Sequence, residues 1–394
     1  MKRYLDDRIA KDLLRKLVFV TGARQVGKTT LSRQLQAAAT PSHYLNYDIA
    51  ADRASIERFG WQADAKLIVL DELHKMAGWK PWLKGVIDGR AAGQQLLVTG
   101  SARMDTFRQA GESLAGRYLS WRLHPISVKE WCEHSPASAT NNAPTPEEAL
   151  THLLKRGGFP EPCLLPADAD GDIDAERWRK QYANGLVRED VLEFSRLQEL
   201  GTMRVLLELL RVRVGSPLSL ASIGRDLGVS QPTVKRHLDV LQALYIVFTV
   251  QPWHHNIARS LVQSPKIYFY DTGMISTNEN DPVTQGVRFE NAVAGMLLKH
   301  AHFLQDAQAA PVDLHYVRTK DGAEIDFALS NGSQLTHLIE CKLSDATPHR
   351  AFQRILAQWP KTEAVQLVRH LRNAETRHGV HITQAADWLA KLAA

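Results

Sequence analysis

The chain has 394 residues, of which 44% are hydrophobic and 23% are charged, and its formal net charge is +5. This is ordinary globular usage, and the length predicts two or three domains. No apolar run approaches the roughly 18 residues that a membrane-spanning helix needs, and the N-terminal segment lacks the apolar core of a signal peptide, so we expect a cytoplasmic protein with no membrane partner.

Short apolar runs alternate with helical patterns over the first part of the chain, which indicates a largely parallel α/β sheet. The predicted strands span residues 17–21, 43–48, 66–71, 96–101 and 118–123. A polar stretch rich in Pro, Ser and Asn, residues 133–148, ends this pattern. The three cysteines, Cys132, Cys163 and Cys341, match no metal-ligand spacing and are expected to be reduced.

Mostly helical sequence follows to about residue 243, then two strand-like runs at 245–250 and 266–270, and a last α/β segment. The predicted architecture is a parallel α/β domain at 1–132, a helical and winged-helix region at 149–284, and a second α/β domain at 285–394.

The segment "GARQVGKTT" (22–30) lies between an apolar strand and a helix and matches the phosphate-binding pattern G-x-x-x-x-G-K-[ST]. Glycines let the backbone wrap around a phosphate chain, and the helix N-terminus favours the anion. Lys28 is expected to reach the β- and γ-phosphates of ATP, and the Thr29 hydroxyl to ligate Mg²⁺. The predicted ATP-binding residues are Gly22, Ala23, Arg24, Gln25, Val26, Gly27, Lys28, Thr29 and Thr30. The alternative is a glycine-containing turn with a solvated lysine.

The segment "KLIVLDELHK" (66–75) supplies a companion motif, because its two acids emerge at the carboxyl end of a buried strand, where open α/β sheets bind ligands. Asp71 would hold Mg²⁺ through water, and Glu72 would orient and deprotonate the attacking water. The alternative is a strand that simply ends in two acids.

Residues 218–247 have a helix-turn-helix pattern, followed by the two strand-like runs of a winged-helix hairpin. Gly228 allows the turn and Ser230 is a natural N-cap. The second helix would carry polar residues into the DNA major groove. The DNA-binding candidates are Gln231, Thr233, Lys235 and Arg236 on this helix and Arg259 in the hairpin loop. Winged helices also dock proteins, so this pattern predicts the fold more firmly than the partner.

In the terminal segment a helix at 286–300 precedes strands at 314–319, 323–329 and 334–343. If the last two strands pair across the "SNG" turn, Asp326, Glu340 and Lys342 converge at one end of the sheet. Two carboxylates can bind Mg²⁺ and a lysine can position the attacking water. The alternative is two ordinary strands with charged outer faces.

Several of these motifs resemble motifs of known ATPase families. The added strand between the two nucleotide motifs resembles the additional-strand ATPases, and "LLVTGSAR" (96–103) resembles the sensor strand of AAA+ proteins, with Ser101 between the γ-phosphate and Glu72. "LAGRYLSWRLHPISVKEW" (114–131) resembles the AAA+ ATPases with a C-terminal domain of unknown function 4143. This resemblance implies an oligomer whose arginine finger is Arg117, or its rival Arg103; a salt-bridging role for Arg117 is the alternative. "GGFPE" (157–161) resembles the Gly-x-Pro lid motif of switch ATPases, which would place Pro160 near the nucleotide.

The Asp…Glu-x-Lys order of the terminal segment resembles the PD-(D/E)xK nuclease superfamily. Glu290 matches the additional acid on the preceding helix, beside Asp326, Glu340 and Lys342, and "ID" replaces the usual "PD". The resemblance implies a nuclease-like fold, and we expect this fold without efficient cleavage.

We therefore expect an ATP- and Mg²⁺-dependent homo-oligomer that binds duplex or branched DNA as a motor or remodeller. Two hypotheses compete with this one. The first is an ATP-controlled, Mg²⁺-dependent nuclease, and the second is an ATP-driven regulatory switch that docks protein partners.

Overall fold

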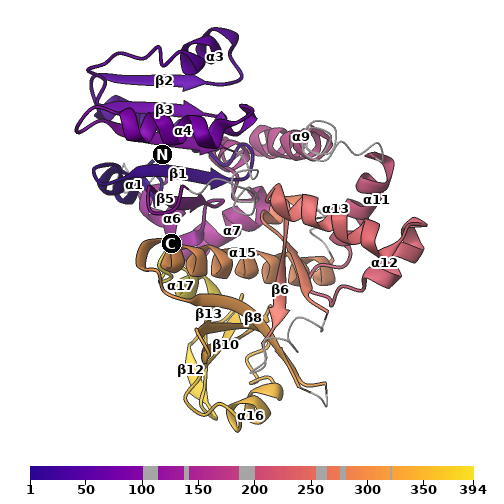
Figure 1. The fold of residues 1–394 in the computed structure, drawn as a ribbon. Coiled ribbons are helices and arrows are strands. Elements are labelled where there is room, and N and C mark those ends of the chain that lie inside the picture. The colour runs from indigo at the N-terminus through magenta and orange to yellow at the C-terminus, as the bar shows by residue number, and fades with distance from the viewer. Residues whose placement is uncertain (101–113, 137–141, 186–199, 254–263, 276–280, 320–321) are drawn as a thin grey trace. The chain divides into compact units, whose positions relative to one another are not determined.

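The computed structural model describes residues 1–100, 114–136, 142–185, 200–253, 264–275, 281–319 and 322–394 (Figure 1). Contacts between residues divide the chain into two compact units. The first comprises Met1–His124 with Ala243–Tyr245, and the second comprises Pro125–Gln242 with Ile246–Ala394.

The first unit is built on a five-stranded sheet in the order β2-β3-β4-β1-β5, with every neighbouring pair parallel. The strands are β1 (Leu17–Gly22), β2 (Ser42–Asn46), β3 (Leu67–Asp71), β4 (Gln95–Gly100) and β5 (Tyr118–Leu123). Residues of β1 and β3 are buried without interruption. A parallel sheet covered on both faces requires such continuous apolar strands, so the structure confirms the predicted α/β fold.

Helices cover this sheet. They are α1 (Asp6–Leu13), α2 (Lys28–Ala38), α3 (Ala50–Glu57) and α4 (Trp79–Gly89), with the short η1 (Leu73–Lys75) after β3. Alternate strand residues such as Phe19, Leu70 and Val98 pack with Ile56 of α3 and Leu83 of α4 in one apolar cluster. This packing fixes β3 beside β4 and so aligns the carboxyl ends of the strands.

The second unit begins with helices (Figure 1). They are α6 (Val128–His134), α7 (Pro146–Arg156), α8 (Pro160–Leu164), α9 (Ala169–Gly185), α11 (Leu200–Arg211), α12 (Leu220–Leu227) and α13 (Gln231–Ala243). A capping box between Thr145 and Glu148 starts α7, which satisfies backbone donors that the first helical turn leaves unbonded.

An eight-stranded mixed sheet follows in the order β12-β13-β11-β10-β9-β8-β6-β7. Its strands are β6 (Val247–Pro252), β7 (Lys266–Phe269), β8 (Val312–Arg318), β9 (Glu324–Asn331), β10 (Gln334–Lys342), β11 (Glu363–Val368), β12 (Glu375–Arg377) and β13 (Val380–Gln384). The hairpin β6–β7 joins the rest through a short parallel pairing of β6 with β8 at Gln251 and Pro252. The hairpin that follows α13 and the terminal strands therefore share one sheet.

The longest described helix, α15 (Pro282–Gln308), packs on this sheet, and η5 (Thr272–Met274), α16 (Ala351–Leu356) and α17 (Ala385–Leu389) complete the unit. Lys299 of α15 lies 2.6 Å from Glu130 of α6, with both side chains buried. Such a pair fixes the position of α15 because either charge alone would be costly. Within the ranges that the structure describes, no helix combines the length and apolar character needed to cross a membrane.

The "GGFPE" and "YDTG" segments meet in the second unit. The buried carboxylate of Asp271 accepts hydrogen bonds from the backbone N–H groups of Gly158 (2.6 Å), Phe159 (3.0 Å) and Gly273 (2.6 Å). Pro160 begins α8. Asp271 thus stabilises the turn before α8, a partnership that the two motifs read separately do not reveal.

Candidate nucleotide site and nuclease-like cluster

The phosphate-binding segment lies between β1 and α2, where close backbone packing requires glycine. A side chain at Gly22 would bring its Cβ to 2.4 Å from the carbonyl oxygen of Leu123. Gly27 precedes α2 with φ 102°, a left-handed conformation that side chains rarely adopt. Among the other predicted nucleotide ligands, Arg24, Gln25, Thr29 and Thr30 are exposed, whereas Ala23 and Val26 are buried.

Lys28 is buried at the start of α2, and its ammonium group points back into the loop. Nζ donates hydrogen bonds to the carbonyl oxygens of Gly22 (3.0 Å) and Ala23 (2.7 Å). The lysine is therefore held against the loop that would enclose a phosphate chain, which is the placement that a phosphate-binding lysine requires.

Thr29 and Asp71 lie side by side at the carboxyl edge of the sheet. The Thr29 hydroxyl donates a hydrogen bond of 2.9 Å to Asp71 Oδ2, and the hydroxyls of Tyr44 and Thr99 also donate to this carboxylate. Asp71 is 1% exposed. Hydroxyl and carboxylate oxygens are the ligands that Mg²⁺ prefers, so these two residues fit the ion that the sequence predicts for them.

Glu72 follows with a strained backbone, φ 55°, a conformation that is uncommon for non-glycine residues and clusters at functional sites. Its carboxylate lies 3.3 Å from Nδ1 of the buried His74. Burial raises the pKa of Glu72, the Lys28 charge lowers it, and the Asp71 charge raises it. A raised pKa suits a carboxylate that must accept a proton near neutral pH.

The structure gives no support to a catalytic role for the other residues predicted from the sequence for this site. Arg117 lies 3.4 Å from Asp88, in the salt bridge that the alternative interpretation expects. Ser101 and Arg103 lie outside the described residues, as does Arg259 of the hairpin loop.

The nuclease-like residues of the second unit do converge. The backbone N–H of Asp326 donates to Glu340 Oε2 (3.2 Å), and Lys342 Nζ donates to Glu340 Oε1 (2.6 Å). Glu290 comes from α15, and its Oε1 accepts a hydrogen bond of 2.7 Å from the Tyr268 hydroxyl. The strands β9 and β10 pair in antiparallel fashion across the "SNG" turn, as predicted.

A second lysine enters this cluster from β7. Lys266 Nζ lies 2.7 Å from Glu324 and 3.9 Å from both Glu290 and Asp326, and its side chain is 2% exposed. No sequence motif connected Lys266 with these acids, because Lys266 lies 24 residues before Glu290 and still further from Asp326 along the chain. Its only signal was a lysine at the start of an otherwise apolar strand.

We define the acidic cluster as Glu290, Glu324, Asp326 and Glu340, with Lys266 and Lys342 as its cations. Burial, followed by the charge of Asp326, raises the pKa of Glu290 to about 7 and that of Glu340 to about 8. Protonated carboxyl groups are poor metal ligands. No group of three residues with metal-ligand geometry occurs in the described parts of the chain. In this arrangement the ammonium group of Lys266 lies beside the acids and balances part of their charge.

The stability of the protein should therefore depend on pH through Glu340. Since the unfolded glutamate ionises near its ordinary pKa of 4.5 and the native one near 8, the native state holds more protons between these values, and the free energy of unfolding falls as pH rises. Glu340→Gln should flatten this decline in denaturation experiments run from about pH 5 to about pH 8. Glu363→Gln, at an exposed position, is the control. If the free energy of unfolding fell with pH as steeply in Glu340→Gln as in wild type, the raised pKa of Glu340 would be contradicted.

The helix-turn-helix segment has the predicted elements. Ser219 caps α12, Gly228 ends it with φ 67°, and the Ser230 hydroxyl accepts from the N–H of Thr233 (3.3 Å). Among the DNA-binding candidates on α13, Gln231, Lys235 and Arg236 are exposed and Thr233 is half-buried. The charged face of α13 is thus open to solvent.

Three family models match the chain. An AAA domain matches residues 14–132, a domain of unknown function, DUF8612, matches 147–282, and another, DUF4143, matches 285–388. The first unit is therefore an AAA-type P-loop ATPase domain, a class that binds nucleoside triphosphates. The chain combines this AAA domain with a C-terminal DUF4143 domain, as the sequence motifs predict.

Uncharacterized proteins of Mycobacterium tuberculosis and Mycobacterium bovis are each 29% identical over 315 residues, which cover 79% of this chain and 66% of each relative. This chain thus spans just under two thirds of their length. A Walker-type ATPase of Pyrococcus abyssi has a similar solved structure, with 14% identity, a TM-score of 0.46, and coverage of 72% of this chain and 94% of that one.

Proposed function

We propose that the protein is a DNA-dependent ATPase that acts as a motor or remodeller on duplex or branched DNA. The observation that carries the hydrolytic part is the 2.9 Å contact of the Thr29 hydroxyl with Asp71, beside Glu72 and the phosphate-binding segment. Metal ligand, candidate base and phosphate-binding lysine thus come from one edge of one sheet.

Each residue has a distinct role in this proposal. Lys28 binds the β- and γ-phosphates, and Thr29 and Asp71 hold Mg²⁺, which neutralises charge on the phosphates when bound. Glu72 orients the attacking water and accepts its proton, and His74, 3.3 Å away, positions the Glu72 carboxylate. Arg117 remains the candidate finger for a neighbouring copy in a homo-oligomer.

The exposed face of α13 supports the DNA part of the proposal. Lys235 and Arg236 are exposed, while Val234 and Leu238 of the same helix are buried. A helix held by its apolar side with cations outward can meet phosphates or enter a groove. We rank the nuclease alternative lower, because the buried Lys266 ammonium lies among the carboxylates of the acidic cluster, 2.7 Å from Glu324 and 3.9 Å from Asp326.

DNA binding is tested by fluorescence anisotropy with duplex, single-stranded and junction DNA over a range of salt. The double variant Lys235→Ala/Arg236→Ala should weaken binding about tenfold or more and reduce the slope of log K against log salt by roughly 1–2, because up to two phosphate contacts are lost. The matched control is Arg177→Ala/Lys180→Ala on α9, where both side chains are at least 70% exposed.

Equal DNA affinity in both double variants would remove α13 from the proposal. If the wild type bound no form of DNA, the exposed face would instead favour the regulatory switch that docks protein partners. Stimulation of ATP turnover by DNA in the wild type, diminished in Lys235→Ala/Arg236→Ala, is the result that the proposal expects.

A further inference from the structure

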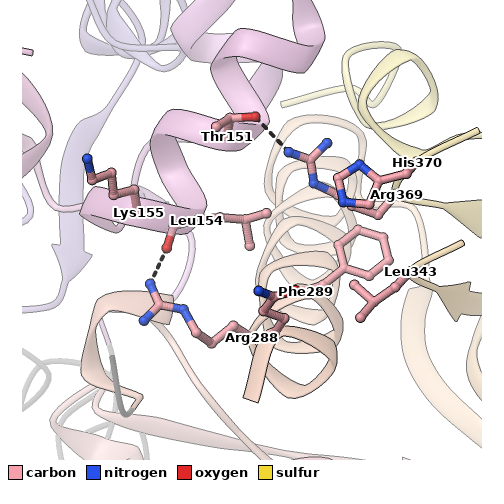
Figure 2. Close-up of a pocket in the computed structure, with 9 residues that line it drawn as sticks. Thr151, Leu154, Lys155, Arg288, Phe289, Leu343, Arg369 and His370 are labelled. Carbon is pink, nitrogen blue, oxygen red and sulfur yellow. Dashed lines mark hydrogen bonds between the residues drawn. The ribbon is translucent and has the colours of Figure 1, made fainter. Parts of the chain in front are cut away.

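The second unit contains a cavity of about 380 Å³ between α7, the beginning of α15, and the ends of β10 and β11 (Figure 2). Leu343 directly follows β10, and Arg369 and His370 directly follow β11, which pairs with β10 in parallel. The carboxyl ends of adjacent parallel strands are where α/β sheets bind ligands. The volume lies in the usual range of small-molecule sites.

The cavity is lined by cations from three separate elements. Lys155 lies in the last turn of α7, Arg288 lies in α15 and Arg369 follows β11. Arg288 and Arg369 are only 5% and 6% exposed, and no acidic side chain occurs among the described residues that line the cavity. Guanidinium groups buried at a cavity wall provide a strong attraction for an anion.

Neighbouring groups hold these cations in place. Arg369 donates to the Glu147 carboxylate. It also donates to the Thr151 hydroxyl, and Arg288 donates to the carbonyl of Leu154 (Figure 2). A guanidinium has five N–H donors, and these bonds of Arg369 use two. The Lys155 ammonium lies 2.5 Å from Asp172. The positively charged groups are therefore oriented before any ligand arrives.

The other residues that line the cavity form an apolar side and a polar rim. Leu154, Phe289 and Leu343 provide the apolar side, and the exposed His370 and Gln285 provide further hydrogen-bonding groups at the rim. Inorganic phosphate would leave the apolar side uncovered, and a purely apolar ligand would leave the arginines without an anion. The complementary ligand is a compact anion that carries a flat, weakly polar body.

We propose that this cavity binds a nucleoside phosphate, with the phosphate against Arg369 and the nucleoside against Leu343 and Leu154. Such a group can arrive as a free mononucleotide or as the phosphorylated end of a DNA strand. The site is separate from the phosphate-binding segment of the first unit and does not depend on ATP hydrolysis.

The test is calorimetric titration of the whole chain with thymidine 5′-monophosphate and with thymidine, in a Lys28→Ala background that disables the ATP site. Thymidine 5′-monophosphate should bind, and thymidine should bind at least about tenfold more weakly because the charge-assisted hydrogen bonds are lost. Arg369→Gln and His370→Ala should weaken the nucleotide, and Leu343→Trp should abolish binding by filling the cavity.

Lys361→Ala, at another exposed lysine of the same unit, should leave binding unchanged. His370 is exposed, so its variant keeps the test valid if Arg369→Gln fails to fold. Absence of nucleotide binding, or equal binding by wild type, His370→Ala and Leu343→Trp, would overturn the proposal. Preference for a 5′-phosphorylated over a 5′-hydroxyl oligonucleotide, lost in Leu343→Trp, would identify strand ends as the source; binding of the mononucleotide without that preference would identify free nucleotides.

Discussion

Glu72→Gln is expected to lower ATP turnover by about 10²–10⁴-fold, the usual contribution of a positioned general base. Glutamine keeps the size of the side chain but cannot accept the proton of the attacking water. Because Lys28 and the Thr29–Asp71 pair are unchanged, the affinity for ATP with Mg²⁺ should stay within a few-fold of wild type. Phosphate release measures the turnover and nucleotide titration measures the affinity, so the two experiments separate catalysis from binding.

The control for this experiment is Glu57→Gln, at an exposed glutamate of the same unit, which should retain wild-type turnover. His74→Ala should lower turnover less than Glu72→Gln, because His74 acts only through the position of the carboxylate, 3.3 Å away. Turnover by Glu72→Gln equal to that of wild type would show that Glu72 is not the base.

Lys266→Met is expected to lower the free energy of unfolding by about 3–5 kcal/mol, the cost of breaking a buried ion pair from one side. Methionine preserves the apolar length of the side chain but removes the ammonium group that lies 2.7 Å from Glu324 and 3.9 Å from Asp326. The acidic cluster would then keep its carboxyl groups in a buried position without their central cation. Urea denaturation of the whole chain measures the loss.

Glu324→Gln introduced into Lys266→Met should recover part of that loss, since residues in one ionic cluster are energetically coupled. Lys180→Met, at a side chain that is 73% exposed, should change stability by less than about 0.5 kcal/mol. A Lys266→Met protein as stable as wild type would show that the lysine does not neutralise the acidic cluster.

The parallel sheet and its nucleotide motifs were predictable because local patterns encode them. Continuous apolar runs marked β1 and β3, and their predicted ends differ from the observed ones by one residue. Alternation and the "SNG" turn gave the pairing of β9 with β10. In each case the residues that decide the structure are neighbours in sequence.

The partners of Asp71 could not be predicted, because they depend on strand order. The sheet places β3 between β2 and β4, so that Thr99 lies directly opposite Asp71 and Tyr44 reaches it from the other side. Nothing in the segment "LDE" says which strands flank it. The same holds for Asp271, whose hydrogen bonds to Gly158 and Phe159 join segments more than 100 residues apart.

Lys266 changed the interpretation of the nuclease-like motif most. The sequence placed Glu290, Asp326, Glu340 and Lys342 in the right order, and the structure brings them together. Only the shared sheet, in which β6 pairs with β8, carries β7 to this place. The motif predicted which acids come together, but the positive charge among them belongs to Lys266, which is not part of the motif.

The central proposal is that the chain pairs an ATP-hydrolysing site with a C-terminal domain that does not cleave DNA. The most direct measurement follows phosphate release and strand cleavage in one reaction, with linear, supercoiled and branched DNA and with Mg²⁺ or Mn²⁺, for wild type, Glu72→Gln and Glu340→Ala. We predict phosphate release that DNA stimulates and Glu72→Gln abolishes, with intact DNA in every reaction. Cleavage by wild type that Glu340→Ala abolishes, or phosphate release indifferent to both DNA and Glu72, would contradict the account.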